Sequence, residues 1–357
     1  METTAAPLLQ PPNIKQLADS PDLHFIPSNY VHSTNDPGDS SATDPDDSNS
    51  IPIIDFSLLT SGDPHQRSIA IHNLSKACQD WGFFMVVNHG ISENLMKAVI
   101  DCTHDFFNLP EEDKREYAGK HVLDPIRCGT SFNASKENVF FWRDYLKVFV
   151  HPHFHSPTKP QCYRDIISEY CEKIGEVAKK LLGGISESLG LEESFLDKAL
   201  DLKSGLQIFV GNYYPSCPQP ELTMGMPPHS DHGLLTLLIQ NQVSGLQVQY
   251  QGKWINVNAL PNSLLVNTGD HLEIFSNGKY KSNMHRAAVN NKVTRISIAT
   301  AHGPSLETIV SPASPLVDNE NSAAAYIPMK YRDYLELQQS NQLDGKSCLE
   351  RLKISRN

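Results

Sequence analysis

The second half of this 357-residue chain contains a series of short strand-like runs at close spacing. Turn signals such as Gln251-Gly252 and Asn277-Gly278 separate the runs. Many short strands at even spacing are typical of a β-sandwich or a jelly roll. The runs are LQIFVGNYY, LLTLLIQ, GLQVQY, KWINV, SLLVNTG, HRAAV and RISIATA.

The first half is richer in helical patterns. Two apolar strands, IPIIDF and WGFFMVVNHG, flank the first helical stretch, and Ser92 is a candidate N-cap for the next. Residues 120–160 combine aromatic residues and prolines without a clear period, and we expect them to be irregular. The sequence thus predicts a mixed α+β fold, a jelly-roll core flanked by helices. The main helical stretches are 66–80, 92–107, 163–189 and 331–339.

Composition divides the chain into regions. Residues 32–50 are rich in Asp, Ser and Pro and nearly free of apolar side chains, so they cannot offset the entropy of ordering and predict a flexible linker. The expected regions are an N-terminal extension with this acidic linker (1–50), a helix-rich region (51–200), the jelly-roll core (201–310) and a C-terminal helical segment (311–357).

Charge and cysteine content exclude several classes of protein. The formal net charge of −11 disfavours binding to nucleic acid phosphates. The seven cysteines show no C-x-x-C spacing, which argues against a disulfide framework or a structural zinc site. The N-terminus lacks a secretory pattern, and no apolar run approaches the length of a membrane span. We therefore expect a cytoplasmic protein, a monomer, with no membrane partner.

The pattern PPHSDHGLLTLL offers a metal site. Residues two apart on a strand project from one face, so His229 and Asp231 could reach a common ion. His285, at the head of a later predicted strand, could supply a third ligand. Two histidines and one carboxylate on one face leave three octahedral positions open, as in non-haem Fe(II) oxygenases.

Other histidines could mimic such a site. H-x-D alone occurs by chance in many chains, and HPHFH (His151, His153 and His155) looks like a ligand set. That cluster lies in a Pro-rich stretch without a carboxylate at strand spacing, so we interpret it as loop surface. The remaining decoys are His232, His271 and His302.

A second pair of residues favours the metal interpretation. Arg295 and Ser297 follow His285 and share a strand face, which we expect to lie next to the strand of His285. An Arg fork and a Ser hydroxyl would anchor the far carboxylate of a dicarboxylate that chelates iron. Asn212 and Tyr214 end an earlier strand and could add hydrogen bonds, although core packing explains them equally well.

From Ile51 to Ile354 the chain resembles the plant 2-oxoglutarate/Fe(II)-dependent dioxygenases of specialised and hormone metabolism, such as flavonol synthase, anthocyanidin synthase and hyoscyamine hydroxylase. The motifs that carry the resemblance include WGFFMVVNHG, FFNLP, NYYPSCPQPEL, HSDHGLLTLL, NTGD, HRA, RISIAT and DGKS. The resemblance implies a distorted jelly-roll (double-stranded β-helix) core, with Fe(II) as cofactor, 2-oxoglutarate and O₂ as co-substrates, and ascorbate in support. The residues that match the family are the iron ligands His229, Asp231 and His285 and the 2-oxoglutarate partners Arg295, Ser297, Tyr214 and Asn212.

The resemblance leaves the substrate open. Ala301 and Gly303 stand where many members have larger residues, and Val210 stands where some flavonoid-oxidising members have Lys. We expect a small phenolic, terpenoid or alkaloid metabolite that is hydroxylated, O-demethylated or desaturated. The expected substrate contacts are Phe132, Phe141, Trp142 and Ala301.

Two other functions compete with this one. A zinc hydrolase on a β-barrel scaffold could use the same two histidines and Asp231, but it would give Arg295 and Ser297 no role. A non-enzymatic small-molecule binding protein could keep the fold, but it would be expected to lose part of the triad.

Overall fold

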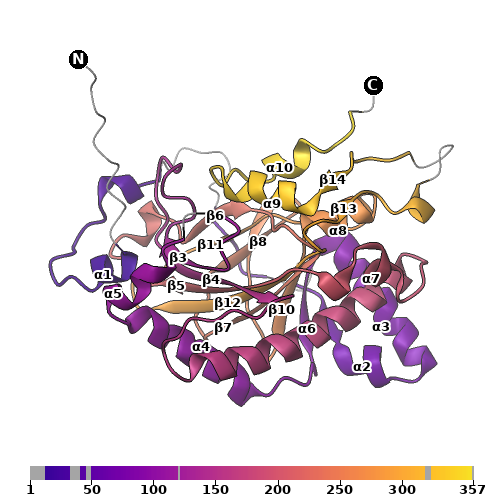
Figure 1. Ribbon diagram of the computed structural model, residues 1–357, viewed down its shortest axis with the longest axis horizontal. Helices are drawn as coiled ribbons and strands as arrows, with labels where there is room; N and C mark the ends of the chain where they lie inside the picture. Colours follow the sequence, from indigo (N-terminus) through magenta and orange to yellow (C-terminus); the bar gives the residue numbers. More distant parts are fainter. Residues whose placement is uncertain (1–12, 33–40, 46–49, 120, 318–322, 356–357) are drawn as a thin grey trace.

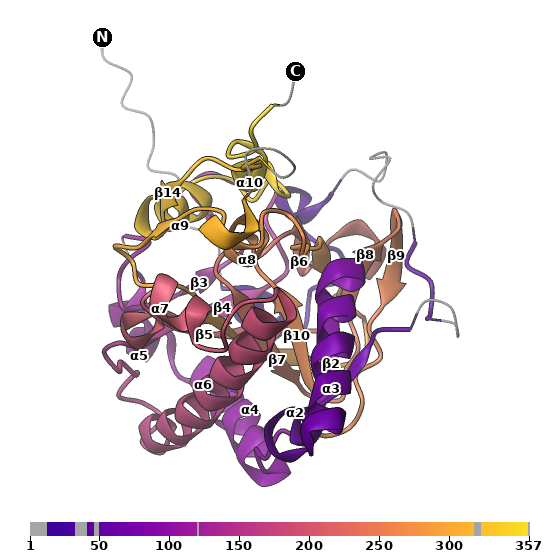
Figure 2. The ribbon, with the colours of Figure 1, turned by 90° about the vertical axis from the view of Figure 1, so that its right-hand side faces the viewer.

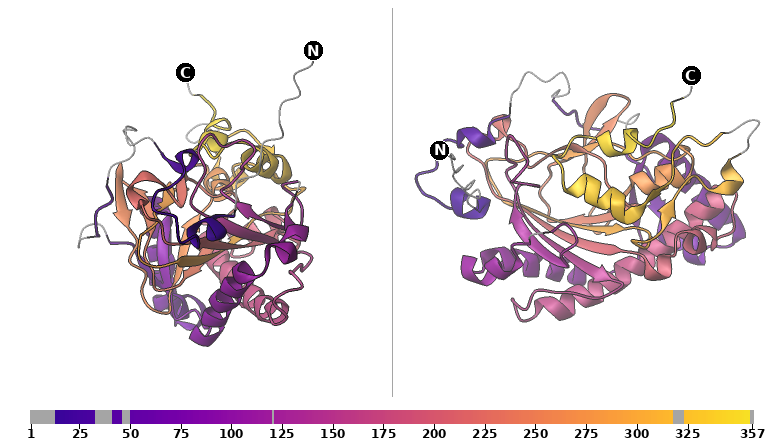
Figure 3. Two further views of the ribbon diagram at one scale, coloured as in Figure 1. Left: turned by 90° about the vertical axis from the view of Figure 1, so that its left-hand side faces the viewer. Right: turned by 45° about the horizontal axis from the view of Figure 1, so that its top comes forward.

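Two facing β-sheets with helices packed around them form the protein (Figure 1). The computed structural model describes residues 13–32, 41–45, 50–119, 121–317 and 323–355. The longer helices between residues 64 and 188 lie on the outer side of the larger sheet, and the smaller sheet and the C-terminal segment lie across its other side (Figures 2 and 3). The arrangement is the expected jelly roll flanked by helices.

The larger sheet has eight strands among the described residues, and only its first pair is parallel. In spatial order they are β1 (Ile53–Asp55), β2 (Phe83–Val87), β10 (Leu264–Thr268), β7 (Leu235–Gln240), β12 (Arg295–His302), β5 (Gln207–Tyr214), β4 (Asp144–His151) and β3 (Ile126–Thr130).

The smaller sheet carries one wall of the site. Part of the expected linker, residues 41–45, runs beside it, where Thr43 forms a bridge with Ile255. Residues 33–40 and 46–49 of that linker lie outside the described residues. In spatial order the strands are β6 (Met226–His229), β11 (His285–Ala287), β8 (Leu246–Tyr250) and β9 (Lys253–Asn256), and β13 (Ile309–Val310) pairs separately with β14 (Met329–Lys330).

The predicted N-cap Ser92 is confirmed, whereas the helix expected from residue 66 begins two residues earlier, after a cap that the sequence analysis did not name. The Ser92 side chain accepts a hydrogen bond from the Leu95 backbone amide, and Asp63 forms a capping box with Gln66 ahead of Pro64. The helices are α1 (Ile14–Ala18), α2 (Phe56–Ser61), α3 (Pro64–Lys76), α4 (Glu93–Asn108), α5 (Glu111–Lys114), α6 (Tyr163–Ser188), α7 (Phe195–Ala199), α8 (Asp270–Phe275), α9 (Tyr331–Gln339) and α10 (Ser347–Glu350).

Alternation along β12 shows how the larger sheet divides its two faces. Ile296 and Ile298 point outward into the main hydrophobic core, where α4 and α6 pack on the strand. Arg295, Ser297 and Ala299 point inward and line a cavity between the sheets. The outer face therefore supplies the hydrophobic stabilisation, and the inner face is free to carry polar groups.

The expectation that 120–160 is irregular is wrong, because this stretch contributes β3 and β4. On β4 the apolar Leu146 and Val148 face the core, while Tyr145 and Lys147 line the cavity. Polar residues on a strand are usually a sign of solvent, but here they face an internal cavity. The alternation of core-facing and cavity-facing residues along β4 is therefore hard to recognise in the sequence, because the cavity-facing residues are charged or aromatic.

No helix in the described part of the chain is long and apolar enough to cross a bilayer.

Replacing Phe209 with alanine tests the outer core. Its ring is fully buried and meets Tyr163 and Tyr170 edge-on, with centroids 6.4 and 6.5 Å away. We expect Phe209→Ala to lower the free energy of unfolding by about 3–5 kcal/mol in a denaturant titration. Phe25→Ala is the control, since that ring is 74% exposed and its loss should change stability little. Equal effects of the two substitutions would contradict the packing described.

Candidate metal centre and the adjoining cavity

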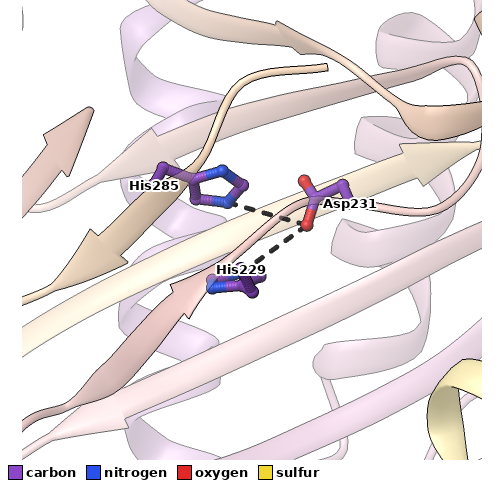
Figure 4. A group of neighbouring side chains, drawn as sticks. All are labelled: His229, Asp231 and His285. Carbon is purple, nitrogen blue, oxygen red and sulfur yellow. Dashed lines mark ion pairs between the residues drawn. The ribbon is translucent and has the colours of Figure 1, made fainter. Parts of the chain in front are cut away.

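His229, Asp231 and His285 meet between the ends of two strands (Figure 4). His229 is the last residue of β6, and His285 is the first residue of β11 and its direct cross-strand partner. We expected Asp231 to share a strand with His229. It lies instead in the loop that follows β6. The loop turns the carboxylate back toward the imidazoles, which strand alternation alone would not do.

The three side chains offer one ligand atom each within a small space. Asp231 Oδ1 lies 3.7 Å from His229 Nε2 and 3.6 Å from His285 Nε2. All three ligand atoms lie within 4.8 Å of one another, so one ion could bind all of them. This is the only such group of His, Cys, Asp and Glu found among the described residues.

Neighbouring groups orient each ligand. The Nδ1 atom of His229 lies 2.8 Å from the carbonyl oxygen of Pro227, which can only accept, so Nδ1 carries the proton and Nε2 keeps its lone pair. His285 Nδ1 likewise faces the carbonyl of Asn283 at 3.3 Å. Asn267 on β10 donates to Asp231 Oδ2 at 2.9 Å and leaves Oδ1 for an ion.

The protonation states suit a cation. Burial, and after it the imidazole of His285, lower the pKa of His229 to about 3. Burial on its own would raise the pKa of Asp231, but the two imidazoles and the Asn267 amide outweigh it and lower that pKa to about 2. At neutral pH the site thus offers a neutral His229 and an ionised carboxylate.

Hydrogen bonds hold the loop that carries Asp231. The backbone amide of Asp270 donates to the carbonyl of Asp231 at 2.8 Å, and the Asp270 carboxylate accepts from Ser230 at 3.2 Å and from Tyr334 at 2.6 Å. Gln338 donates to the carbonyl of Ser230 at 3.2 Å. Helix α9 is therefore tied to the loop and braces it from outside.

The structure brings together the four residues expected to bind a dicarboxylate. Arg295 pairs with Tyr214, and Ser297 pairs with Asn212, across β12 and β5. Contrary to the expectation, β12 is not next to the strand of His285, because β11 lies in the other sheet. The anchor residues and the triad thus face one another across the cavity rather than lying side by side.

The guanidinium of Arg295 has capacity for a ligand. It is 2% exposed and donates through Nη2 to Gln240 Oε1 at 2.7 Å, while its Nε has no hydrogen-bond partner among the described residues. The guanidinium carbon lies 5.1 Å from the centre of the Tyr214 ring, a cation–π distance. A buried donor without a partner is costly, so a bound carboxylate would relieve it.

The cavity beside these groups is lined by both sheets and by α9. Phe132 and Ala301 line it as expected. Trp142 does not, because it is fully buried in a cluster with Ile14 and Tyr30, and Phe141 packs behind the lining. The lining residues that the sequence did not reveal include Asn267, Lys147, Arg127, Arg143 and Gln339.

The missed residues had a weak signal. Tyr145 and Lys147 alternate with Leu146 and Val148 in RDYLKV, which is the period of a strand with one polar face, although Asp144 interrupts the pattern after Arg143. Asn267 stands in the motif NTGD without a charge to mark it. Residues of α9 enter the cavity only through tertiary packing, which local patterns do not report.

The other histidines do not form a second site. His232 and His271 are buried, and burial lowers the pKa of each to about 3. His232 Nδ1 lies 2.9 Å from the Tyr331 hydroxyl, and His271 Nδ1 accepts from the Gly233 amide. His153 of HPHFH is exposed. His232 and His271 thus hydrogen-bond to Tyr331 and to the Gly233 amide, and none of these three histidines belongs to the metal-ligating group found among the described residues.

Two family models match the chain. Residues 205–304 match the 2OG-Fe(II) oxygenase superfamily, and residues 51–168 match the N-terminal region of non-haem dioxygenases in morphine synthesis. The 2-oxoglutarate-dependent dioxygenase 19 of rice (Oryza sativa subsp. japonica) is 44% identical over 92% of this chain and 97% of its own length. Thebaine 6-O-demethylase of Papaver somniferum is 37% identical over 96% of each chain.

A solved structure agrees with these relatives. The crystal structure of JOX2 in complex with 2OG, Fe and JA superposes with a TM-score of 0.86 at 31% identity, covering 98% of this chain and 99% of that one. The chain belongs to the 2OG-Fe(II) oxygenase superfamily, in its plant 2-oxoglutarate-dependent dioxygenase branch. It is an enzyme that uses Fe(II) and 2-oxoglutarate, and the comparisons do not support the zinc hydrolase or the binding protein.

Removal of one imidazole tests the metal centre. We expect His285→Ala to abolish stoichiometric Fe(II) binding, because two ligands hold the ion far more weakly than three. Anaerobic Fe(II) titration followed by calorimetry measures this. His153→Ala, at an exposed histidine, is the control and should bind iron normally. Iron binding that survives in His285→Ala but fails in His153→Ala would move the site to HPHFH.

Asn267 provides a subtler test. Its amide orients Asp231, so Asn267→Ala should weaken Fe(II) binding by about 10–100-fold while the fold stays intact. The same titration gives the dissociation constant, and circular dichroism checks the fold. Unchanged affinity would mean that Asp231 is oriented by its loop alone.

Proposed function

We propose that His229, Asp231 and His285 hold the Fe(II) of this oxygenase. The observation that carries the proposal is the convergence of three ligand atoms from β6, the following loop and β11 at one end of a cavity. Two imidazole nitrogens and one carboxylate on one side leave positions open for a bidentate acid and O₂. Asn267 and the loop contacts of α9 keep the ligands in place.

The opposite wall binds 2-oxoglutarate in this proposal. Arg295 and Ser297 hold the far carboxylate, since Arg295 has an unpartnered Nε and Ser297 presents its hydroxyl on the same face. Tyr214 packs under the guanidinium, and Asn212 donates toward Ser297 Oγ at 3.3 Å. These contacts fix the acid so that its other end reaches the triad.

With iron, 2-oxoglutarate and O₂ bound, the centre supplies an oxidant strong enough to remove hydrogen from carbon, with succinate and CO₂ as co-products. The chain itself positions the substrate and excludes water. The buried walls around the triad, including Phe83 and Leu238 on the larger sheet, keep the reacting carbon in an apolar setting.

The substrate in this proposal is a small plant specialised metabolite. The reaction is hydroxylation or O-demethylation, with desaturation as a further outcome of the same hydrogen removal. A relative named as a demethylase supports the inclusion of O-demethylation. We also propose a cytoplasmic, monomeric enzyme that binds neither membranes nor nucleic acid and is supported by ascorbate.

Anaerobic absorption spectroscopy tests the function. Addition of Fe(II) and then 2-oxoglutarate should give a charge-transfer band that needs both. In Arg295→Gln the band should need about 10–100-fold more 2-oxoglutarate, the cost of losing charged hydrogen bonds. Arg332→Gln, on the outside of α9 and paired with Glu307, is the matched control and should behave as wild type. A wild-type protein that gives no band would overturn the proposed function.

A further inference from the structure

Two cationic side chains face each other in the cavity wall at one edge of the larger sheet. Arg127 on β3 and Lys147 on β4 are direct cross-strand partners, and both line the cavity. Like charges directly opposite on neighbouring strands destabilise a sheet, because their side chains share one face at short range. A pair placed in this way calls for an anion between them.

Neither cation has an acidic partner. None of the ion pairs formed among the described residues involves Arg127 or Lys147. Lys147 is 6% exposed, and its Nζ donates only to Gln339 Oε1, at 2.9 Å. Arg127 Nη1 is buried without a hydrogen-bond partner. Asp144, three residues before Lys147 on β4, points to the other face and accepts from the amides of Ile14 and Lys15.

The charged form of Lys147 is destabilised by its burial beside two other cations. Burial, and after it the charges of Arg127 and Arg143, lower the pKa of Lys147 to about 7. A lysine in such a place is stabilised as the cation by an anion that enters the cavity.

The charges at the metal and 2-oxoglutarate sites balance one another without Arg127 and Lys147. A divalent metal with Asp231 leaves one positive charge, and Arg295 adds a second, which together balance the two carboxylates of 2-oxoglutarate. Asp231 is the only carboxylate among the lining residues that the structure describes. Arg143 is held by Asn212 at 2.8 Å and by the carbonyl of Ser131. Arg127 and Lys147, like Arg143, still lack a counter-charge once the metal and the co-substrate are bound: Arg127 Nη2 lies 3.5 Å from the Tyr145 hydroxyl and Lys147 Nζ 5.9 Å from the centre of the Phe149 ring, and neither partner is an anion.

We propose that Arg127 and Lys147 form a subsite for the carboxylate of the organic substrate, so that this oxygenase acts on a small carboxylic acid. The inference rests on the proposed function and narrows its substrate class. Arg127 Nη1 and Lys147 Nζ offer one donor to each carboxylate oxygen.

The position on the sheet fits a substrate of modest size. Lys147 pairs with Val210, and Val210 pairs with Ala299 on β12, and all three line the cavity. Strands lie about 4.8 Å apart, so β4 stands about 10 Å from the strand that carries the 2-oxoglutarate anchor. A substrate carboxylate at Lys147 therefore leaves room for a ring or short chain across Val210 and Ala299.

Binding of paired acids and esters tests the subsite. The probes are benzoate, phenylacetate, hydrocinnamate and cinnamate, each compared with its methyl ester. The full-length protein is loaded with Fe(II) and saturating 2-oxoglutarate without oxygen, and affinity is measured by calorimetry. We expect the best acid to bind about tenfold to a hundredfold more tightly than its ester, as charged hydrogen bonds predict.

Substitution of Lys147 and of Arg127 tests whether these two residues cause the preference for acid over ester. Lys147→Met keeps the length of the side chain without its charge, and it should erase the preference for acid over ester while leaving 2-oxoglutarate affinity unchanged. Arg127→Gln should reduce the preference as well. Lys147→Met should also raise the Tm of the ligand-free protein, because it removes a buried charge. Lys97→Met, at a lysine whose side chain is 71% exposed, is the matched control.

The outcomes separate this subsite from the wider function. If the wild-type protein binds each acid no more tightly than its methyl ester, the proposed subsite is overturned. The same holds if it binds neither the acids nor the esters. A preference that survives in both variants also overturns it. Loss of 2-oxoglutarate binding together with acid binding in Lys147→Met would instead assign Lys147 to the co-substrate and overturn the inference. Failure of the wild type to bind Fe(II) and 2-oxoglutarate would be a failure of the proposed function itself.

Discussion

The structure depends on placing polar groups in a buried cavity without losing the hydrophobic core. The larger sheet solves this by strand alternation, with Ile296 and Ile298 outward under α4 and α6 and Arg295 and Ser297 inward. Because the helices bury the apolar residues of the outer face of the larger sheet, its inner face can carry polar residues. Because each inward group costs free energy unless it is partnered, the cavity is built as a network in which ligands complete the missing contacts.

The C-terminal segment belongs to the site although it supplies no metal ligand. Tyr334 and Gln338 on α9 hydrogen-bond to Asp270 and to the carbonyl of Ser230, so the loop that carries Asp231 is held from outside. Gly233 in that loop has a φ of +83°, which only glycine adopts without strain. The position of the carboxylate is therefore set by tertiary contacts as much as by the local chain.

Much of this could be predicted from the sequence, because capping, strand period and metal chemistry are local. Ser92, the strands after Leu206 and the meeting of His229 with His285 followed from such rules. The rest could not. β4 was missed because its polar residues face a cavity rather than solvent, and Asp231 was placed on a strand because a loop can imitate strand spacing. Trp142 was placed at the cavity because aromaticity does not distinguish a ligand contact from a core contact.

The order of strands in the larger sheet has an evolutionary consequence. β3 forms one edge of that sheet, and β3 and β4 come from the first half of the chain, whereas the triad and Arg295 come from the second half. Mutations at the edge strand can therefore change what enters the cavity while the oxidising machinery stays constant. Related enzymes can therefore come to accept different substrates through substitutions on the edge strand, while the residues that carry out the oxidation are kept.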